Sequence, residues 1–579
     1  MLLPRAIEAR PALPVALRVP GVRIGRERLV ILGLALFAAA AHGLNMPSYP
    51  AFTLVDDEGI YAAQALAFLR DGAMSPYTYS YDHAPGGWIQ LGLFYALTGG
   101  PAAFGTPIDG GRVLMLLFHV GSAVLLYRVG RLLGASMLAS AVAVVLFTVS
   151  PLATFFQRML LLDNIMVFWL LASLVLLLGG RTWARIALSG LAFGVAALSK
   201  ETAVLVLPVY AVLAWRALGW RATAVWLGAL TLAVLPYPLY ALSRGELWPV
   251  ADPYLPYIAG SDPRARSSLI STLIWQVTRP GGGFWNLNNN FLWYLRHDWL
   301  WRDATFLVLG AGAAIANAVR GLRGDRRLLV PAACALLIGA YLGRGGVVFA
   351  FYIIVAIPFL ALNVALAFDA LARGLDPPRA VRLAGCLLVL LGGVYWWSGA
   401  IEPLYAQRPD TAGRDAAAWV KSHLPPDAKI IGRDDLFAYL REPIDGPGFA
   451  EYHIHWRVAH DPVTMANVFG YQWRSVDYLV ISNSEEDDFW GTDNQIAIAA
   501  RWNAHKIAEW ESSTGESPFH PAQTISVWEA DRLLDPDPAA YLSPDLRHGR
   551  DQLCGPRQAS CEERKPTPLS FFSSPHRPD

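Results

Sequence analysis

The stretch Val55-Asp56-Asp57-Glu58-Gly59-Ile60-Tyr61 places three adjacent carboxylates directly after the first long apolar run of the chain. Ionised groups are costly to keep near lipid, so acids at this position often mark a functional site. An isolated run of like charges is also typical of a solvated loop. The organisation of the remaining chain has to decide between these two interpretations.

The composition is that of a membrane protein. Hydrophobic residues make up 54% of the 579 residues and charged residues 16%, whereas a soluble chain carries about a quarter charged residues. The long apolar runs predict a polytopic α-helical membrane protein, and 21 tryptophans suit rings at the two membrane interfaces. No basic stripe with interleaved aromatic residues occurs, so nothing points to nucleic acid as a partner.

The N-terminal segment sets the orientation. Residues 1–28 carry six arginines and precede the apolar run 29–46. Because positive charge collects on the cytoplasmic side, residues 1–28 are expected in the cytoplasm and the acidic stretch outside. The outer loop contains two amphipathic segments, 59–69 and 86–97. Each is shorter than the roughly 20 apolar residues that a span needs, so both are expected to lie along the interface.

Within the membrane domain predicted over residues 29–400, apolar runs alternate with short basic turns. The expected spans are 29–46, 113–127, 138–155, 165–178, 186–199, 202–215, 222–242, 304–319, 328–342, 347–370 and 383–399. This pattern predicts about eleven spans, with the arginine-rich turns on the cytoplasmic side. The isolated charges then fall on the outer side: Asp56, Asp57, Glu58, Asp163, Lys200 and Arg344. The topology therefore favours a functional site at the outer face.

Beyond residue 400 the composition becomes polar and mixed, which predicts a small extracytoplasmic α/β domain over 401–530. Helices are expected at 415–424 and 493–508, and strands at 428–431, 478–482 and 525–528. Residues 531–579 are rich in Pro, Asp and Arg and are expected to be disordered. The outer loop 243–303 is either a lid over a substrate or an aromatic platform at the interface.

Acids and bases at the ends of different spans are expected to meet at one membrane level. Such a group can bind an anionic headgroup and activate a nucleophile. A carboxylate can accept a proton from an attacking hydroxyl or amine, and Lys200 and Arg344 can neutralise a phosphate. For each residue alone, interfacial snorkelling or a structural ion pair is the competing interpretation.

Several of these segments resemble known motifs. The pattern Asp57-Glu58-Gly59-Ile60-Tyr61-Ala62, followed by His83-Ala84-Pro85-Gly86-Gly87-Trp88, is similar to the first-loop signature of the protein O-mannosyltransferase and aminoarabinose transferase families. Residues 158–164, 198–202 and 351–358 resemble later motifs of the same families, in the same order. These families belong to the GT-C superfamily of polyprenyl-phosphate-sugar-dependent glycosyltransferases, so the resemblance covers roughly residues 30–370.

The resemblance implies roles for individual residues. Asp57 matches the catalytic Asp, Asp163 matches a second functional acid, and Lys200 and Arg344 would contact the lipid phosphate. The expected substrate-binding residues are Asp56, Glu58, Tyr61, His83, Arg158, Lys200, Glu201 and Arg344. The chain departs from the families at Ala84, where they often carry a proline, so the contacts of that turn do not transfer.

The function expected from this resemblance is transfer of a sugar, with inversion, from a polyprenyl-phosphate donor to a protein, lipid or glycan acceptor. The reaction would take place at the outer face of a bacterial-type cytoplasmic membrane. The acids also form a suitable oxygen ligand set for magnesium or manganese, whereas the resemblance implies metal-independent chemistry. Two alternatives stay open: a transporter or flippase that uses the same charges, and a family member that has lost catalysis.

Overall fold

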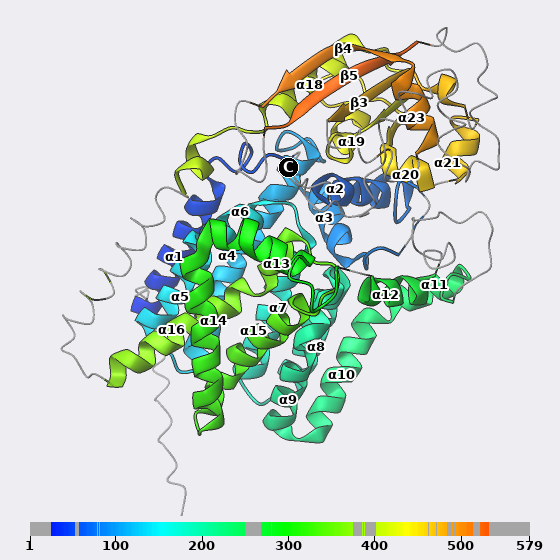
Figure 1. The fold of residues 1–579 in the computed structure, drawn as a ribbon. Helices are drawn as coiled ribbons and strands as arrows, with labels where there is room; N and C mark the ends of the chain where they lie inside the picture. The colour runs from blue at the N-terminus through cyan, green and yellow to red at the C-terminus, as the bar shows by residue number, and fades with distance from the viewer. Residues whose placement is uncertain are drawn as a thin grey trace, which may run out of the picture.

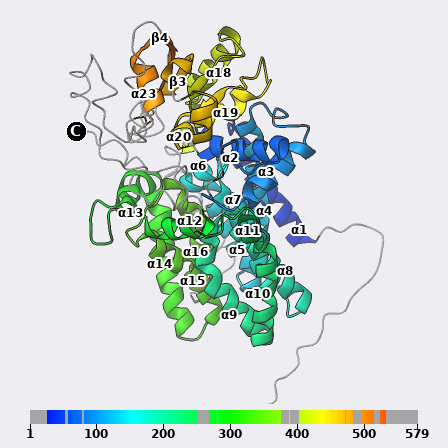
Figure 2. The same ribbon diagram turned by 90° about the vertical axis from the view of Figure 1, so that its right-hand side faces the viewer.

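A bundle of long helices lies beneath a five-stranded sheet in the computed structural model, with short helices of the first outer loop between them (Figures 1 and 2). The structure describes residues 25–52, 57–77, 79, 81–248, 268–279, 281–374, 385, 387, 401–460, 462–470, 472–482, 489, 494–512 and 522–531. Asp56, most of the segment 1–28, most of the last predicted span 383–399 and the tail 532–579 lie outside these residues.

The bundle is built from helices that follow one another through short turns. Its elements are α1 (Arg26–Gly43), α4 (Pro107–Leu132), α5 (Met137–Val149), α6 (Pro151–Arg158), α7 (Leu162–Leu178), α8 (Trp183–Ser199), η2 (Glu201–Val206), α9 (Leu207–Leu218), α10 (Trp220–Val234), α11 (Pro236–Ser243), α12 (Leu269–Thr278), α13 (Asn290–Tyr294), η4 (Leu295–Trp299), α14 (Leu300–Leu322), η5 (Arg326–Leu328), α15 (Leu329–Leu342), η6 (Ala350–Val355) and α16 (Ile357–Gly374). A helix or a broken pair of helices occupies each of the first ten predicted spans.

The number of spans differs from the expectation. Among the described residues, four helices are long and apolar enough to cross a membrane, or up to six if each of two bent helix pairs is one span. The bent pairs break at Ser150 and Leu235, each directly before a proline, which cannot donate the helical hydrogen bond at that point. The chain is thus a multi-pass membrane protein, and the predicted count of about eleven is not confirmed.

The predicted first outer loop forms α2 (Asp57–Leu66), η1 (Ala67–Asp71) and α3 (Gly86–Leu97). Both helices are too short to span, and Figure 1 shows them lying above the bundle and below the sheet. The bounds of α3 coincide with the second predicted interface segment. Small residues allow tight packing here: a side chain at Gly59 would collide with the backbone of Asp434 in the outer domain.

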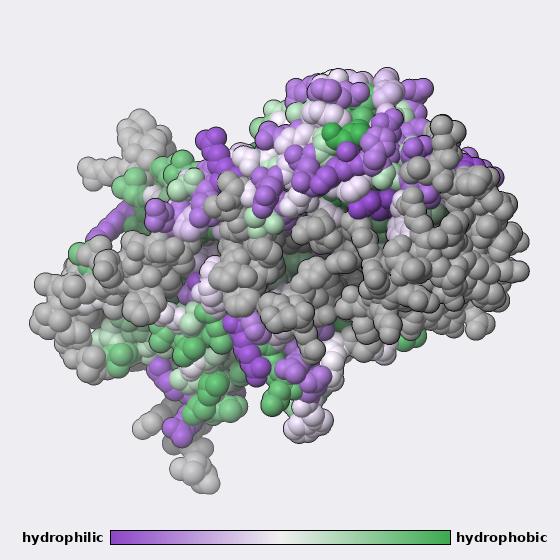
Figure 3. Space-filling view, turned by 45° about the horizontal axis from the view of Figure 1, so that its top comes forward, coloured by the Kyte–Doolittle hydropathy of each residue, from purple (hydrophilic) through white to green (hydrophobic). Residues whose placement is uncertain are grey.

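The predicted outer domain is α/β, and its sheet has the order β2-β1-β3-β5-β4. Its elements are α18 (Thr411–His423), β1 (Ile430–Gly432), α19 (Asp434–Arg441), β2 (Tyr452–Ile454), α20 (His455–His460), α21 (Pro462–Asn467), η7 (Trp473–Ser475), β3 (Tyr478–Ser482), α23 (Gln495–Trp502), β4 (Ala504–Glu511) and β5 (Thr524–Ala530). Strand β1 is parallel to β2 and β3, and β5 is antiparallel to β3 and β4. Figure 3 shows mostly hydrophilic residues over this domain and hydrophobic residues on the flank of the bundle.

In the outer domain one expectation is wrong, and a short strand was not predicted. The segment 493–508 is not one helix, because α23 ends at Trp502 and the chain then enters β4. The pairing of β4 along β5 outweighs the helical pattern of the residues before it. Strand β2 was not predicted, since three residues are too few for a visible period.

Candidate active site

Lys200 lies at the centre of a buried cluster of charges. Helix α8 ends at Ser199, and Lys200 takes an extended conformation before η2 begins, which directs it out of the helix. Its Nζ lies 3.3 Å from the hydroxyl of Tyr61, 3.3 Å from Nε2 of His83 and 3.7 Å from Oδ2 of Asp163. The side chain is only 2% exposed. A buried ammonium needs such partners, because an unpaired charge in the interior is strongly unfavourable.

Asp57 joins this cluster through Tyr61. The two residues are four positions apart on α2, so they share one face of the helix. The Tyr61 hydroxyl interacts with the charge of the Asp57 carboxylate and accepts a hydrogen bond from Lys200. Burial raises the pKa of Tyr61 well above its ordinary value, and the charge of Asp57 raises it further. Tyr61 therefore stays a neutral hydroxyl between the carboxylate and the ammonium.

His83 and Glu201 tie the first outer loop to the end of α8. His83 Nδ1 lies 3.2 Å from Glu201 Oε2, and the Ala84 backbone N–H donates to the other oxygen of Glu201. The carbonyl of His83 accepts hydrogen bonds from the hydroxyls of Tyr79 (2.8 Å) and Tyr237 (3.2 Å). This part of the loop is consequently held from several sides, with the His83 ring between Lys200 and Glu201.

Asp163 faces Lys200 from the first turn of α7. A carboxylate is favoured there by the unpaired backbone N–H groups of the helix N-terminus. Its side chain is 1% exposed. The structure thus brings together Asp57, Tyr61, His83, Asp163, Lys200 and Glu201 from three separate parts of the sequence.

Glu58 makes structural contacts. Its carboxylate forms a two-pronged ion pair with Arg112 of α4, at 2.8 and 2.6 Å, and accepts the backbone N–H of Leu160 at 2.6 Å. Both side chains are fully buried. The third guanidinium nitrogen of Arg112, Nη1, donates to the carbonyls of Met46 and Pro50. This pair fastens α2 to the bundle on the side of the helix away from Lys200.

Arg158 and Arg344 also bind backbone carbonyls. Arg158 is buried and donates to the carbonyls of Ala41, Leu44 and Leu404, so it joins α1 to the chain that enters the outer domain. Arg344 donates to carbonyls of its own turn and lies over the Tyr341 ring, 3.8 Å from its centroid. Within the described part of the chain, these contacts of Arg344 do not reach Lys200 or Asp163.

A second cation near the cluster was not predicted. Arg279 follows α12 and is 6% exposed. It donates to the hydroxyl of Tyr352 at 2.8 Å, and the Tyr352 ring centroid lies 5.6 Å from Lys200 Nζ. The only sequence signal was an arginine in the aromatic outer loop 243–303, where several arginines occur. In the same loop Trp285 is 89% exposed, and both a lid and an interface platform remain consistent with that position.

Two further features bear on ligands. Among the described residues, no group of three or more His, Cys, Asp or Glu side chains is arranged to hold a metal ion.

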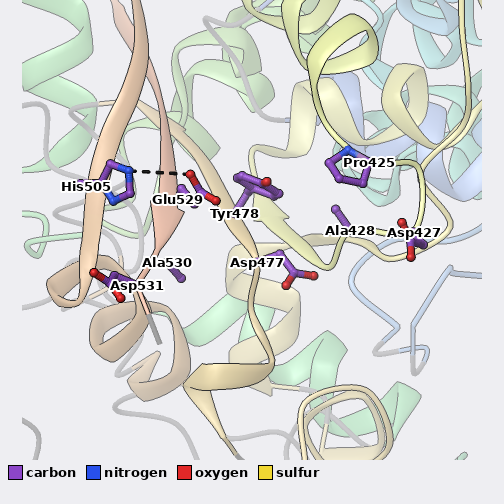
Figure 4. Close-up of a pocket in the computed structure, with 9 residues that line it drawn as sticks. All are labelled: Pro425, Asp427, Ala428, Asp477, Tyr478, His505, Glu529, Ala530 and Asp531. Carbon is purple, nitrogen blue, oxygen red and sulfur yellow. Dashed lines mark ion pairs between the residues drawn. The ribbon is translucent and has the colours of Figure 1, made fainter. Parts of the chain in front are cut away.

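A cavity of about 520 Å³ opens on the outer domain, at the end of the sheet where β1 and β3 begin (Figure 4). Its lining includes four acids, Asp427, Asp477, Glu529 and Asp531, and His505 pairs with Glu529. None of its lining residues belongs to the Lys200 cluster.

Comparison with known proteins gives agreement in fold. The family model of dolichyl-phosphate-mannose-protein mannosyltransferases matches residues 82–240. ArnT from Cupriavidus metallidurans, solved with undecaprenyl phosphate, is similar with a TM-score of 0.53 and 15% identity, covering 86% of this chain and 97% of that one. The oligosaccharyltransferase AglB from Archaeoglobus fulgidus, solved with an inhibitory peptide and a dolichol-phosphate, gives 0.51 and 13%, covering 88% and 75%. No curated protein matches by sequence. The predicted resemblance is confirmed at the level of the fold.

Proposed function

We propose, from this fold and the family match, that the chain is a GT-C glycosyltransferase that moves a sugar from a polyprenyl-phosphate donor to an acceptor. The observation that carries the proposal is the cluster around Lys200. There the first outer loop, the start of α7 and the end of α8 bring the half-buried Asp57 together with the buried Asp163 and Lys200. A carboxylate base beside buried cations is the arrangement that transfer from a phosphate requires.

The donor phosphate is assigned to Lys200 and Arg279. Both cations are almost fully buried and both lie against Tyr352, so a phosphate held by the two would be shielded from water. Preorganised cations act most strongly in such a water-excluded site, because charge grows on the leaving phosphate during the reaction. ArnT was solved with undecaprenyl phosphate, which supports a lipid phosphate as the group bound here.

Asp57 is assigned as the general base. The acceptor hydroxyl or amine loses its proton to the Asp57 carboxylate while its lone pair attacks the anomeric carbon of the sugar. The bond from that carbon to the phosphate oxygen breaks, and its electron pair leaves with the phosphate. Attack opposite the leaving group inverts the anomeric configuration. Asp163 holds Lys200 in place at 3.7 Å, and His83 and Glu201 hold the loop.

The outer face of a bacterial-type cytoplasmic membrane is the proposed location of the reaction. The arginine-rich turns favour the cytoplasm for the opposite end of the bundle, as at residues 320–327, where α14 ends. A lipid-linked donor suits the outer face, because no nucleotide sugar is supplied there. A protein, lipid or glycan acceptor would then approach beneath the outer domain.

Purified full-length protein, incubated with labelled polyprenyl-phosphate pentoses and hexoses and an envelope extract, tests the proposal. Label should move from one donor into the protein, lipid or glycan fraction, and free polyprenyl phosphate should appear in equal amount. The Asp57→Asn variant is the control for background hydrolysis. Intact movement of labelled donor across a proteoliposome membrane, without release of the sugar, would indicate a flippase and overturn the assignment.

A further inference from the structure

The carboxyl ends of two parallel strands in the outer domain point toward the first outer loop. One residue separates Asp434 from the end of β1, and the backbone carbonyl of Asp434 lies against Gly59. Gly59 is two residues after Asp57, the proposed base. At the end of β2, the backbone N–H of Ile454 donates to the hydroxyl of Tyr77 at 2.7 Å. Figure 1 shows α2 beneath α19 and α20, in agreement with these contacts. In open parallel sheets this edge is where functional groups gather.

Arg457 extends this contact to the loop beside the cluster. It lies on α20, and its guanidinium is 3.1 Å from Oδ2 of Asp82. The arginine is 7% exposed and the aspartate 19%. The guanidinium also lies over the Trp456 ring, 4.2 Å from its centroid, which limits its movement. Asp82 is held from the bundle as well, since its carbonyl accepts a hydrogen bond from Gln276 of α12.

Asp82 immediately precedes His83, whose ring lies 3.3 Å from Lys200 Nζ. A shift of the Asp82 backbone therefore moves the ring that borders the proposed phosphate-binding ammonium. Displacements of about 1 Å in groups that position a reaction are enough to cost two orders of magnitude in rate. The ion pair with Arg457 is also well shielded, so water and salt weaken it less than a surface pair.

We propose that Arg457, through its ion pair with Asp82, is a positioning residue of the active site, by which the outer domain sets the place of His83 beside Lys200. The proposal rests on the proposed function, because it assigns to the outer domain a part in donor binding. Arg457 does not contact the donor in this proposal: it holds Asp82, and the position of Asp82 determines the position of His83. The outer domain thus contributes to donor binding by positioning a residue of the active site.

A double-mutant cycle on the Arg457–Asp82 ion pair tests the proposal in the full-length protein. The variants are Arg457→Gln, Asp82→Asn and the double variant, with Arg457→Lys as the conservative change. Arg474→Ala is the matched control, since it removes a guanidinium that lies over Trp473 within the same domain. Arg457→Gln should raise the donor KM about tenfold per folded molecule, with a smaller change in kcat, because the cations around the phosphate are displaced.

The pattern across variants separates positioning from folding. Arg457→Lys should recover part of the donor affinity, and the double variant should be no worse than Arg457→Gln, since both remove the same pair. Arg474→Ala should leave the donor KM unchanged. Equal kcat and KM for wild type and Arg457→Gln, per folded molecule, would reduce the pair to a structural contact and reject the proposal.

A second measurement does not depend on transferase activity. Amide hydrogen exchange should become faster in the peptide that contains residues 81–85 in Arg457→Gln, and stay unchanged there in Arg474→Ala. If no donor is accepted by the wild type, the proposed function fails, and this exchange result still shows whether Arg457 holds the loop. Unchanged exchange in residues 81–85 would reject the positioning role even if the enzyme is active.

Discussion

Replacing Lys200 by methionine removes a buried charge while keeping an unbranched side chain of similar length. The Nζ to Asp163 distance of 3.7 Å corresponds to an attraction of about 4.5 kcal/mol at the effective dielectric constant of roughly 20 that suits protein sites. Breaking a buried pair at one partner costs about 3–5 kcal/mol, since the other charge is left uncompensated. We therefore expect Lys200→Met to unfold at clearly lower denaturant concentration in detergent and to lose donor binding.

The double variant Lys200→Met/Asp163→Asn distinguishes a structural pair from a phosphate-binding cation. Removing both charges should restore most of the stability, because no isolated carboxylate stays buried. Donor binding should not return, since the ammonium that faces the phosphate is still absent. The assays are denaturant unfolding followed by Trp fluorescence and titration with the labelled donor. Wild-type donor affinity in the double variant would refute the assignment of Lys200 to the phosphate.

Four further outcomes are expected. Asp57→Asn should lower kcat by a factor of about 10² to 10⁴ at unchanged donor affinity, measured by single-turnover transfer, because it removes the general base. Arg279→Gln should raise the donor KM more than it lowers kcat, and an equal donor KM in variant and wild type would exclude a phosphate contact. Activity should survive EDTA, because two buried cations, Lys200 and Arg279, supply positive charge for the leaving phosphate without a metal ion. Burial lowers the pKa of His455 from 6.5 to about 3. Between these two pH values the unfolded chain carries a proton on this ring that the folded chain lacks, so the free energy of unfolding should fall by up to about 1.4 kcal/mol for each unit that the pH falls. His455→Gln should remove this contribution to the slope.

The helices of the membrane domain were largely predictable, because membrane helices carry their signal in long apolar runs. The interface segment 86–97 matches α3 residue for residue. The span count was less predictable, since helices such as α15, with 14 residues, are apolar but short, and length alone does not say whether they cross. In the outer domain, β3 was predicted with its observed bounds, whereas the three-residue β2 gave no periodic signal.

The candidate site was predictable where motifs follow one another along the chain. Lys200 and Asp163 stand at helix ends in recognisable segments, and the structure places them 3.7 Å apart. Arg279 could not be selected, because its position depends on how the end of α12 packs against Tyr352, a residue 73 positions later. Arg457 was equally hidden, since its contact with Asp82 spans two domains and 375 positions.

The acidic stretch that begins the outer loop shows why neighbouring acids with the same chemistry have different roles. Successive residues on an α-helix point about 100° apart. On α2 this rotation directs Asp57 and Tyr61 to the Lys200 side, while Glu58 points to Arg112, where its carboxylate oxygens are occupied by two guanidinium nitrogens and the N–H of Leu160. Because its oxygens are occupied and its side chain is fully buried, Glu58 leaves no place beside it for an acceptor hydroxyl or amine. Glu58 therefore cannot replace Asp57 as the base. The Asp57→Asn variant keeps Glu58 and the other acids of the loop, and we expect it to lose transferase activity nevertheless.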